Sequence, residues 1–149
     1  MYRSGITNAL PGGTAWVKIT GMERIASIKD FAVFHQNIWI IDQGNEHDSG
    51  KVWFGFIGKN VGQPSVFDLR TIDGQEMINI VADSSGNIWS LGTDGKVYIR
   101  EGIGPYYPYG KQWIPILNPS ERRVFQIYQS SPGIFAVLPM SDDKKSAGM

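Results

Sequence analysis

The sequence contains no cysteine. A chain without thiols forms no disulfides, binds no metal through thiolates and has no cysteine nucleophile. It also has no apolar run of about 18 residues, the length that a membrane-spanning helix needs, and its first residues do not form the apolar segment of a secretion signal. We therefore expect no direct insertion into a membrane.

An excess of charge of one sign is also missing. Lys and Arg number 14, and Asp and Glu number 14, so the formal net charge is zero. Proteins that bind nucleic acid through its phosphates carry clustered basic residues that displace the counterions. The balance of charge argues against nucleic acid as a partner.

Catalytic and metal-binding sequence patterns are absent too. There is no Gly-x-Ser-x-Gly motif, phosphate-binding loop or dinucleotide fingerprint. His35 and His47 have no evident third ligand for zinc. The turn from Asp42 to Gly50 has three carboxylates and His47 but lacks EF-hand spacing, which favours a solvated turn over a calcium site. We expect no metal, no cofactor and no enzymatic activity.

What the chain has in quantity is glycine and aromatic residues. It contains 18 Gly and 8 Pro, together with 5 Trp, 6 Tyr and 7 Phe. Many turn-forming residues among large flat side chains are typical of antiparallel β proteins. No segment has a convincing helical periodicity. The composition predicts an all-β fold.

The sequence repeats with a period of 46 residues. Ser84–Trp89 is echoed by Ser130–Phe135 at this offset, and the same offset relates Phe67 to Trp113. Asn87-Ile88-Trp89 also matches Asn37-Ile38-Trp39 at an offset of 50, because the turn after Asp42 is longer. A period in the forties indicates a repeat architecture.

The two termini belong to one further repeat. Ser4–Ile6 matches Glu101–Ile103, and Gly13–Ile19 matches Gly110–Ile116, both at an offset of 97. The N-terminal segment is therefore the second half of a repeat, whereas the segment from Arg122 to about Met140 is the first half. The chain holds three repeats, one of them split between its termini.

Each repeat contains four short strands. In the best-preserved repeat these are expected at residues 78–81, 87–91, 96–100 and 112–116, and Asp94-Gly95 is a strong two-residue hairpin turn. Four antiparallel strands with this period form one blade of a β-propeller. Since propellers usually have four to eight blades, this chain is expected to supply half of a six-bladed ring, completed by a second copy or by further blades of a longer chain.

The predicted organisation is a single propeller unit over residues 1–149. Residues 1–20 supply the outer strands of the split blade, residues 21–72 and 73–118 each form a complete blade, and residues 119–140 supply the inner strands of the split blade. Residues 141–149 are polar and without pattern, and we expect them to be disordered.

The residues of the repeat resemble the tectonin β-propeller family. The resemblance rests on an Ile-Trp strand, an Asp-Gly-Lys-Val-Tyr hairpin, Arg-Glu-Gly-Ile and a Gly-x-x-Trp-x-x-Ile strand, and it is clearest over Asn87–Ile116. It is weaker over Asn37–Ile72, where Phe67 replaces the second Trp. The resemblance implies either a sugar- or lipopolysaccharide-binding lectin, or an intracellular scaffold of autophagy and vesicle traffic.

The repeated aromatic residues have two possible roles. Large flat side chains at a fixed register are expected to bury one blade against the next; the alternative is that one of each set is a platform for a sugar ring. These residues are Trp16, Trp39, Phe67, Trp89, Trp113 and Phe135.

A loop that the other repeats do not share supplies the remaining candidate site. Tyr106, Tyr107 and Tyr109 lie on the proline-containing loop from Gly104 to Gly110, where rigid rings with polar tips suit binding. Arg100 and Glu101 beside the loop could bond to sugar hydroxyls or phosphate, as could Arg3 in the matching segment. With Trp16 and Trp113, these residues are the predicted ligand-binding set.

We therefore expect a non-enzymatic binding module that acts as a protein-interaction scaffold in autophagy or vesicle traffic, with a cytoplasmic location. The alternative is a glycan- or lipopolysaccharide-binding lectin with a site on each blade, which would place the protein outside the cell. The expected partner is accordingly a protein or a glycan, together with a second copy or further blades that complete the ring.

Overall fold

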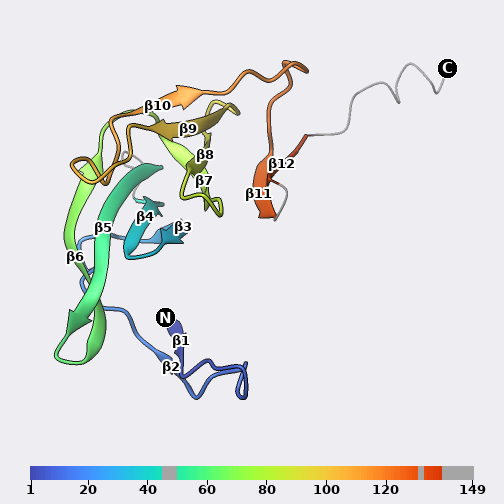
Figure 1. Ribbon diagram of the computed structural model, residues 1–149. Coiled ribbons are helices and arrows are strands. Elements are labelled where there is room, and N and C mark those ends of the chain that lie inside the picture. Colours follow the sequence, from blue (N-terminus) through green and yellow to red (C-terminus); the bar gives the residue numbers. More distant parts are fainter. Residues whose placement is uncertain (45–49, 131–132, 139–149) are drawn as a thin grey trace.

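The computed structural model describes residues 1–44, 50–130 and 133–138 and contains only strands and turns in these ranges (Figure 1). The prediction of an all-β propeller chain is confirmed. Residues 45–49 of the expected solvated turn (Asp42–Gly50) and the whole of the expected disordered tail at 141–149 lie outside the described residues. The strands are β1 (Tyr2–Ser4), β2 (Ala15–Val17), β3 (Ile28–Phe34), β4 (Asn37–Asp42), β5 (Lys51–Asn60), β6 (Gln63–Ile72), β7 (Met77–Ala82), β8 (Ile88–Gly92), β9 (Val97–Glu101), β10 (Gln112–Pro115), β11 (Gln126–Ser130) and β12 (Gly133–Val137).

Two four-stranded antiparallel sheets form the centre of the molecule. Their strand orders are β3-β4-β5-β6 and β7-β8-β9-β10, the simple meander expected of a propeller blade. We call them the first and the second blade. A tight turn is present at Asp94-Gly95, with Gly95 at φ +79° and the Asp94 carboxylate accepting a hydrogen bond from the Lys96 N–H at 3.0 Å. The Gly92 N–H donates to the Lys96 carbonyl at 2.9 Å, so the loop has three residues and not the predicted two.

The two blades share a repeated irregularity. A β-bulge interrupts the pairing between Ile28 and Asp30 in the first blade and between Met77 and Asn79 in the second, at corresponding positions. Bulges of this kind bend the strand and increase its twist. Corresponding residues of these two inner strands are therefore 49 positions apart.

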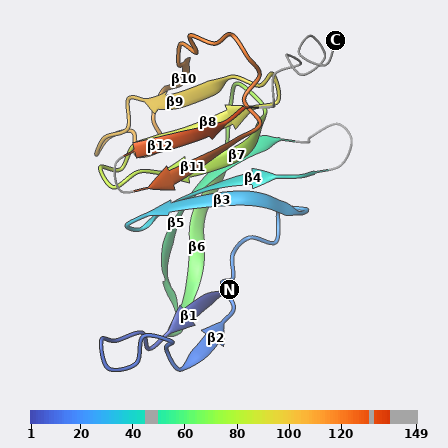
Figure 2. The same cartoon turned by 90° about the vertical axis from the view of Figure 1, so that its right-hand side faces the viewer.

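Two hairpins flank the blades. β1 pairs with β2, β11 pairs with β12, and within the described residues neither hairpin pairs with the other. Figures 1 and 2 show β11–β12 beside β7 and β8, whereas β1–β2 lies at the opposite end of the molecule, toward the end where β5 and β6 join. The ring is open in this structure.

The core lies mainly between the first and second blades. Trp39 and Phe54 of the first blade, which are 1% and 0% exposed, pack in one cluster with Met77 and Ile80 of the second. Burying such a side chain stabilises the fold by roughly 2–3 kcal/mol. A second cluster, which includes Leu91 and Ile127, joins the second blade to β11–β12.

The repeated aromatic residues divide into two groups. Trp39, Trp89 and Trp113 are buried or partly buried in the clusters between blades, as the packing interpretation expects. By contrast, Trp16, Phe67 and Phe135 are 64%, 39% and 54% exposed. The expectation that all six are core residues is therefore wrong for this chain alone.

Candidate functional site

The tyrosine-bearing loop between β9 and β10 has a fixed backbone. The N–H groups of Gly104 and Tyr107 donate to each other's carbonyls at 3.1 and 3.2 Å, and the N–H of Gly110 donates to the Tyr107 carbonyl at 2.9 Å. At the base of the loop the Lys111 N–H donates to the Glu101 carbonyl at 2.7 Å. These hydrogen bonds fix the backbone of the loop and therefore the positions from which its side chains extend.

Arg100 is the internal anchor of this loop. It is only 7% exposed, its Nε donates to the Tyr109 carbonyl at 2.8 Å, and its guanidinium lies 5.1 Å from the centre of the Trp113 ring. Burial lowers its pKa, although an arginine remains charged at neutral pH. Arg100 thus stabilises the loop from within, with its side chain buried and not open to solvent.

Trp113 completes this anchor. Its ring packs against the cluster between the blades, and in the described part of the chain its Nε1 is buried without a hydrogen-bond acceptor. The Arg100 guanidinium lies over the ring, and the ring is partly buried against the cluster. The structure therefore favours the packing role for Trp113.

The three tyrosines have different environments. Tyr106 is 92% exposed, and Tyr107 is 47% exposed with the Lys111 ammonium 4.9 Å from its ring centre. Tyr109 turns inward instead, 5.9 Å from the Phe54 ring and beneath the Arg70 guanidinium at 4.7 Å. The surface of the loop is thus formed by Tyr106 and Tyr107, while Tyr109 holds the loop to the first blade.

Glu101 lies at the exposed edge of the same hairpin. Its carboxylate accepts a hydrogen bond from the Gln112 side chain, the residue opposite it on β10. Of the predicted set, the structure therefore brings together six residues around this loop and separates their roles. Tyr106, Tyr107 and Glu101 face solvent, whereas Arg100, Tyr109 and Trp113 support the loop from below.

Arg3 and Trp16 lie elsewhere. They face each other across β1 and β2, with the Arg3 guanidinium 5.4 Å from the Trp16 ring, at the opposite end of the molecule from the tyrosine loop (Figures 1 and 2). The predicted ligand-binding residues consequently do not form a single site.

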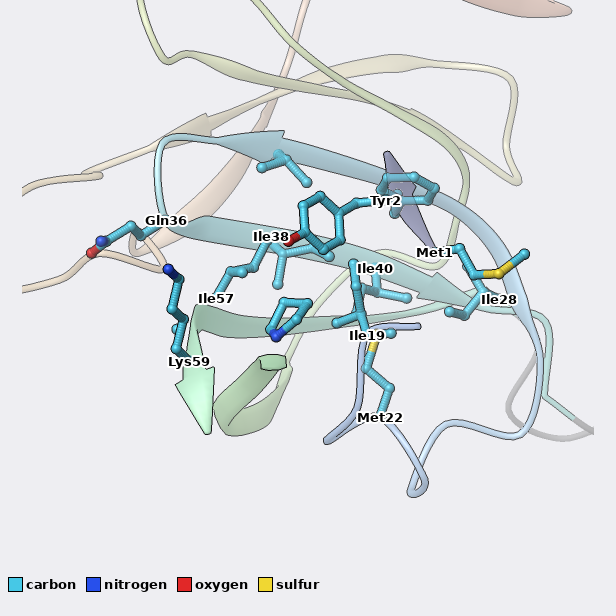
Figure 3. A pocket seen from close by; sticks show the side chains of 14 residues that line it. Met1, Tyr2, Ile19, Met22, Ile28, Gln36, Ile38, Ile40, Ile57 and Lys59 are labelled. Carbon is cyan, nitrogen blue, oxygen red and sulfur yellow. The ribbon is translucent and has the colours of Figure 1, made fainter. Parts of the chain in front are cut away.

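A groove that the sequence analysis missed lies on the open face of the first blade. It encloses about 640 Å³ and is lined mainly by apolar side chains, among them Ile28, Phe31, Ile38 and Ile40. Figure 3 shows the Tyr2 ring extending over Ile38 in this groove. The signal in the sequence was the apolar run Phe31–Phe34 in β3, which predicts buried positions but not what covers them.

Two kinds of feature are absent from the described residues. No helix there is long and apolar enough to cross a membrane. No group of three or more His, Cys, Asp or Glu side chains is arranged to bind a metal ion in that part of the chain.

With this geometry in view, the chain can be compared with known proteins. It is of the β-propeller class, and residues 87–116 match the family model described as "Hyd_WA: Propeller". This is the segment on which the resemblance to tectonin-like propellers rests, and the resemblance is confirmed there. No curated protein matches the chain.

Among solved structures, one described as "YCF48 bound to D1 peptide" is similar, with a TM-score of 0.47 and 9% sequence identity. The aligned region covers 74% of this chain and 33% of that one, so the present chain spans about a third of that chain's length.

Proposed function

We propose that this chain is a non-enzymatic binding module that acts as a protein-interaction scaffold, with a place in autophagy or vesicle traffic. The observation that carries the proposal is the exposed Tyr106 ring, 92% accessible, on a loop whose backbone is fixed by its own hydrogen bonds. Rigid, amphipathic tyrosines give large contact areas at low cost in side-chain entropy, and they are enriched in protein interfaces.

The backbone of the loop can fold without the Tyr106 and Tyr107 side chains. The loop between β1 and β2 makes the same backbone hydrogen bonds, from Thr7 and Leu10 to each other and from Gly13 to Leu10, without a tyrosine. At an offset of 97, Ala9 and Leu10 occupy the positions of Tyr106 and Tyr107. The tyrosines therefore add surface chemistry to a loop that folds equally well without them.

The surroundings of the tyrosines suit a polar protein segment. Lys111 lies above the Tyr107 ring, and the Glu101 carboxylate is at the neighbouring strand edge. Aromatic rings flanked by one cation and one anion can pack against an apolar residue of a partner and bond to its backbone or charged groups. This combination supports a protein ligand.

The proposal is tested by affinity capture with the full chain as bait and quantitative mass spectrometry. Replacing both Tyr106 and Tyr107 by alanine should reduce capture of the specific partners at least about tenfold, the loss expected for two aromatic interface anchors. Leu10→Ala, at the matching position of the other loop, is the control and should capture as wild type does. Partners that do not depend on the tyrosines, or that have no role in membrane traffic, would contradict the proposal.

A lectin is the second candidate, because the exposed Tyr106 ring could stack on the apolar face of a sugar. A glycan array and a lipopolysaccharide pull-down with the same variants separate the two functions. Saturable glycan binding that is lost in Tyr106→Ala would favour the lectin.

The scaffold proposal also includes a cytoplasmic location, which imaging of the tagged endogenous protein would test.

A further inference from the structure

Each end of the series of blades presents an apolar face that no neighbouring blade covers. On β3, Ile28, Phe31 and Val33 are 45%, 55% and 41% exposed. At the other end, Tyr128 of β11 and Phe135 and Val137 of β12 are 48%, 54% and 41% exposed. We call these the β3 face and the β12 face. Neither is explained by the tyrosine loop, which lies elsewhere.

The internal repeat shows what covers the β3 face. At the offset of 49 set by the two bulges, Ile28 and Phe31 correspond to Met77 and Ile80 of the second blade, which are 0% and 2% exposed. Met77 and Ile80 are buried because the first blade packs on them. The β3 face is thus the same surface without a preceding blade.

The β12 face corresponds to the other half of that interface. Ala32 is paired with Trp39 in the first blade, and the corresponding pair at the chain's end is Tyr128 and Phe135. Ala32 and Trp39 are 6% and 1% exposed because they pack against the second blade. The β12 face is therefore the same surface without a following blade.

We propose that the two faces bind each other between two copies of this chain. β11–β12 of each copy would pack on β3 of the other, and the two identical contacts would close a ring of six blades. An assembly with twofold symmetry satisfies both faces at once and leaves no open end for further growth. The proposal is independent of the proposed binding function, since no residue of the tyrosine loop takes part.

A chain of polar contacts along the inner strands supports this pairing. The Asp30 carboxylate accepts from the Ile80 N–H at 2.8 Å, and the Asn79 side-chain oxygen accepts from the Ile127 N–H at 2.8 Å. Each blade therefore bonds to the backbone of the next blade from the same position. Gln126 occupies this position in β11, and its side chain would accept from the Phe31 N–H of the second copy. In the single chain this N–H donates to the neighbouring Asp30 carboxylate at 2.9 Å, so the contact would exchange one acceptor for another.

The open strand edges define the register of the contact. In the second blade β8 pairs with β9, with Trp89 opposite Ile99. The corresponding residues are Phe135 at an offset of 46 and Tyr2 at an offset of 97. The edge of β12 would consequently pair with β1 of the second copy, with Phe135 opposite Tyr2. The Tyr2 ring already lies on the first blade in the groove of Figure 3, as the outer strand of such a blade requires.

The first test is the mass of the protein in solution by light scattering and sedimentation. Wild type should have twice the chain mass of 16.6 kDa. Phe31→Asp should shift it to the single-chain mass, because a carboxylate cannot be buried unpaired in the contact. Val61→Asp introduces the same charge at a side chain that is 97% exposed in the turn between β5 and β6, and it should remain a dimer.

The second test does not depend on a destabilising variant. Since the chain has no cysteine, Tyr2→Cys combined with Phe135→Cys should give a covalent dimer on mild oxidation, because opposed residues on paired strands reach disulfide distance. Tyr2→Cys combined with Tyr128→Cys, which places one thiol on the strand away from that edge, should form far less. A monomeric wild type, a dimer that Phe31→Asp leaves intact, or equal cross-linking of both pairs would overturn the proposal.

Discussion

The β1–β2 and β9–β10 hairpins have the same local structure in two different environments. Arg3 faces Trp16 as Arg100 faces Trp113, and both strand pairs keep the same register at an offset of 97. In each, the arginine Nε donates to a loop carbonyl, of Gly12 in one and Tyr109 in the other. The shared register and the shared arginine hydrogen bond therefore follow from the local sequence, because the two environments differ.

The environments differ in what lies against the tryptophan. Trp113 packs on the core between the blades, whereas Trp16 is 64% exposed. Since the two hairpins are otherwise alike, the exposure of Trp16 reflects a missing neighbour. An exposed aromatic residue in one copy of a repeat is thus weak evidence for a binding site when its counterpart in another copy is packed.

The largest expected difference between the hairpins concerns these tryptophans. Trp113→Ala should lower the free energy of unfolding by about 3 kcal/mol, because it removes a packed indole from the core. Trp16→Ala should cost less than about 1 kcal/mol in dilute protein, where its ring contacts mainly solvent. Chemical denaturation followed by fluorescence measures both values.

Protein concentration sharpens this test. If a second copy covers Trp16, the loss in Trp16→Ala should grow as the concentration rises, because association stabilises only the wild type fully. The loss in Trp113→Ala should not change with concentration. Equal losses for the two variants in dilute protein would show that the environments do not differ as described.

The next effect is that of the paired arginines. Arg100→Ala should cost about 2 kcal/mol, because it removes a charge-assisted hydrogen bond to Tyr109 and the contact with the Trp113 ring. Arg3→Ala should cost about half as much, since water can replace the lost bond in the less buried hairpin. Hydrogen exchange of the Lys111 and Thr14 amides would report the loosening of each loop separately.

Arg100→Lys is the informative control. The lysine keeps the charge but lacks the planar guanidinium, which both donates to the Tyr109 carbonyl and lies over the Trp113 ring. Most of the loss of stability should therefore remain. Full recovery of stability in Arg100→Lys would mean that charge, and not geometry, is what the loop needs.

A smaller effect should be the same in both hairpins. Gly13 and Gly110 have φ of +66° and +73°, and a Cβ there would lie 2.3 Å from the Ser4 carbonyl oxygen or 2.9 Å from that of Glu101. Alanine at either position should cost about 1.5 kcal/mol, since this backbone conformation is strained for residues with a side chain. Gly104→Ala, with no atom within 4 Å of its Cβ, is the control and should be neutral.

The sequence was most informative where the structure is local. The match of Ser4–Ile6 to Glu101–Ile103 predicted the equivalence of two hairpins far apart in the chain, and Asp94-Gly95 predicted a turn. Both depend on neighbouring residues and on turn geometry, which the local sequence determines. The four strands predicted between residues 78 and 116 are confirmed for the same reason.

Tertiary environment could not be predicted in the same way. Arg100 looked like a surface ligand because charged residues are mostly exposed, yet the loop closes over it. β5 and β6 run 10 residues each, against 5 and 4 for β9 and β10, and Phe56 opposite Phe67 replaces the arginine-tryptophan pair. A repeat predicts the shared pattern and leaves such individual departures open.

A further effect concerns a position where the hairpins differ in chemistry. The Tyr98 hydroxyl donates to the Asp94 carboxylate at 2.6 Å, and burial, with the bond to Asp94 and its charge, raises the pKa of Tyr98 to about 12. The residue at the matching position of the other hairpin is Met1. Any stability linked to this ionisation must therefore come from β9 alone.

Because the folded pKa of Tyr98 is raised above its ordinary value near 10, its contribution is fully present below about pH 10 and is lost as the pH rises through about 12. Tyr98→Phe keeps the ring and removes the hydroxyl, so it should cost about 1.5 kcal/mol at pH 8 and flatten the alkaline decline. Denaturation midpoints from pH 8 to about 11.5 measure both. Tyr106→Phe is the control and should match the wild-type stability at pH 8, because its exposed hydroxyl bonds to water in both the folded and the unfolded chain. An alkaline decline that is unchanged in Tyr98→Phe would assign the decline to another group.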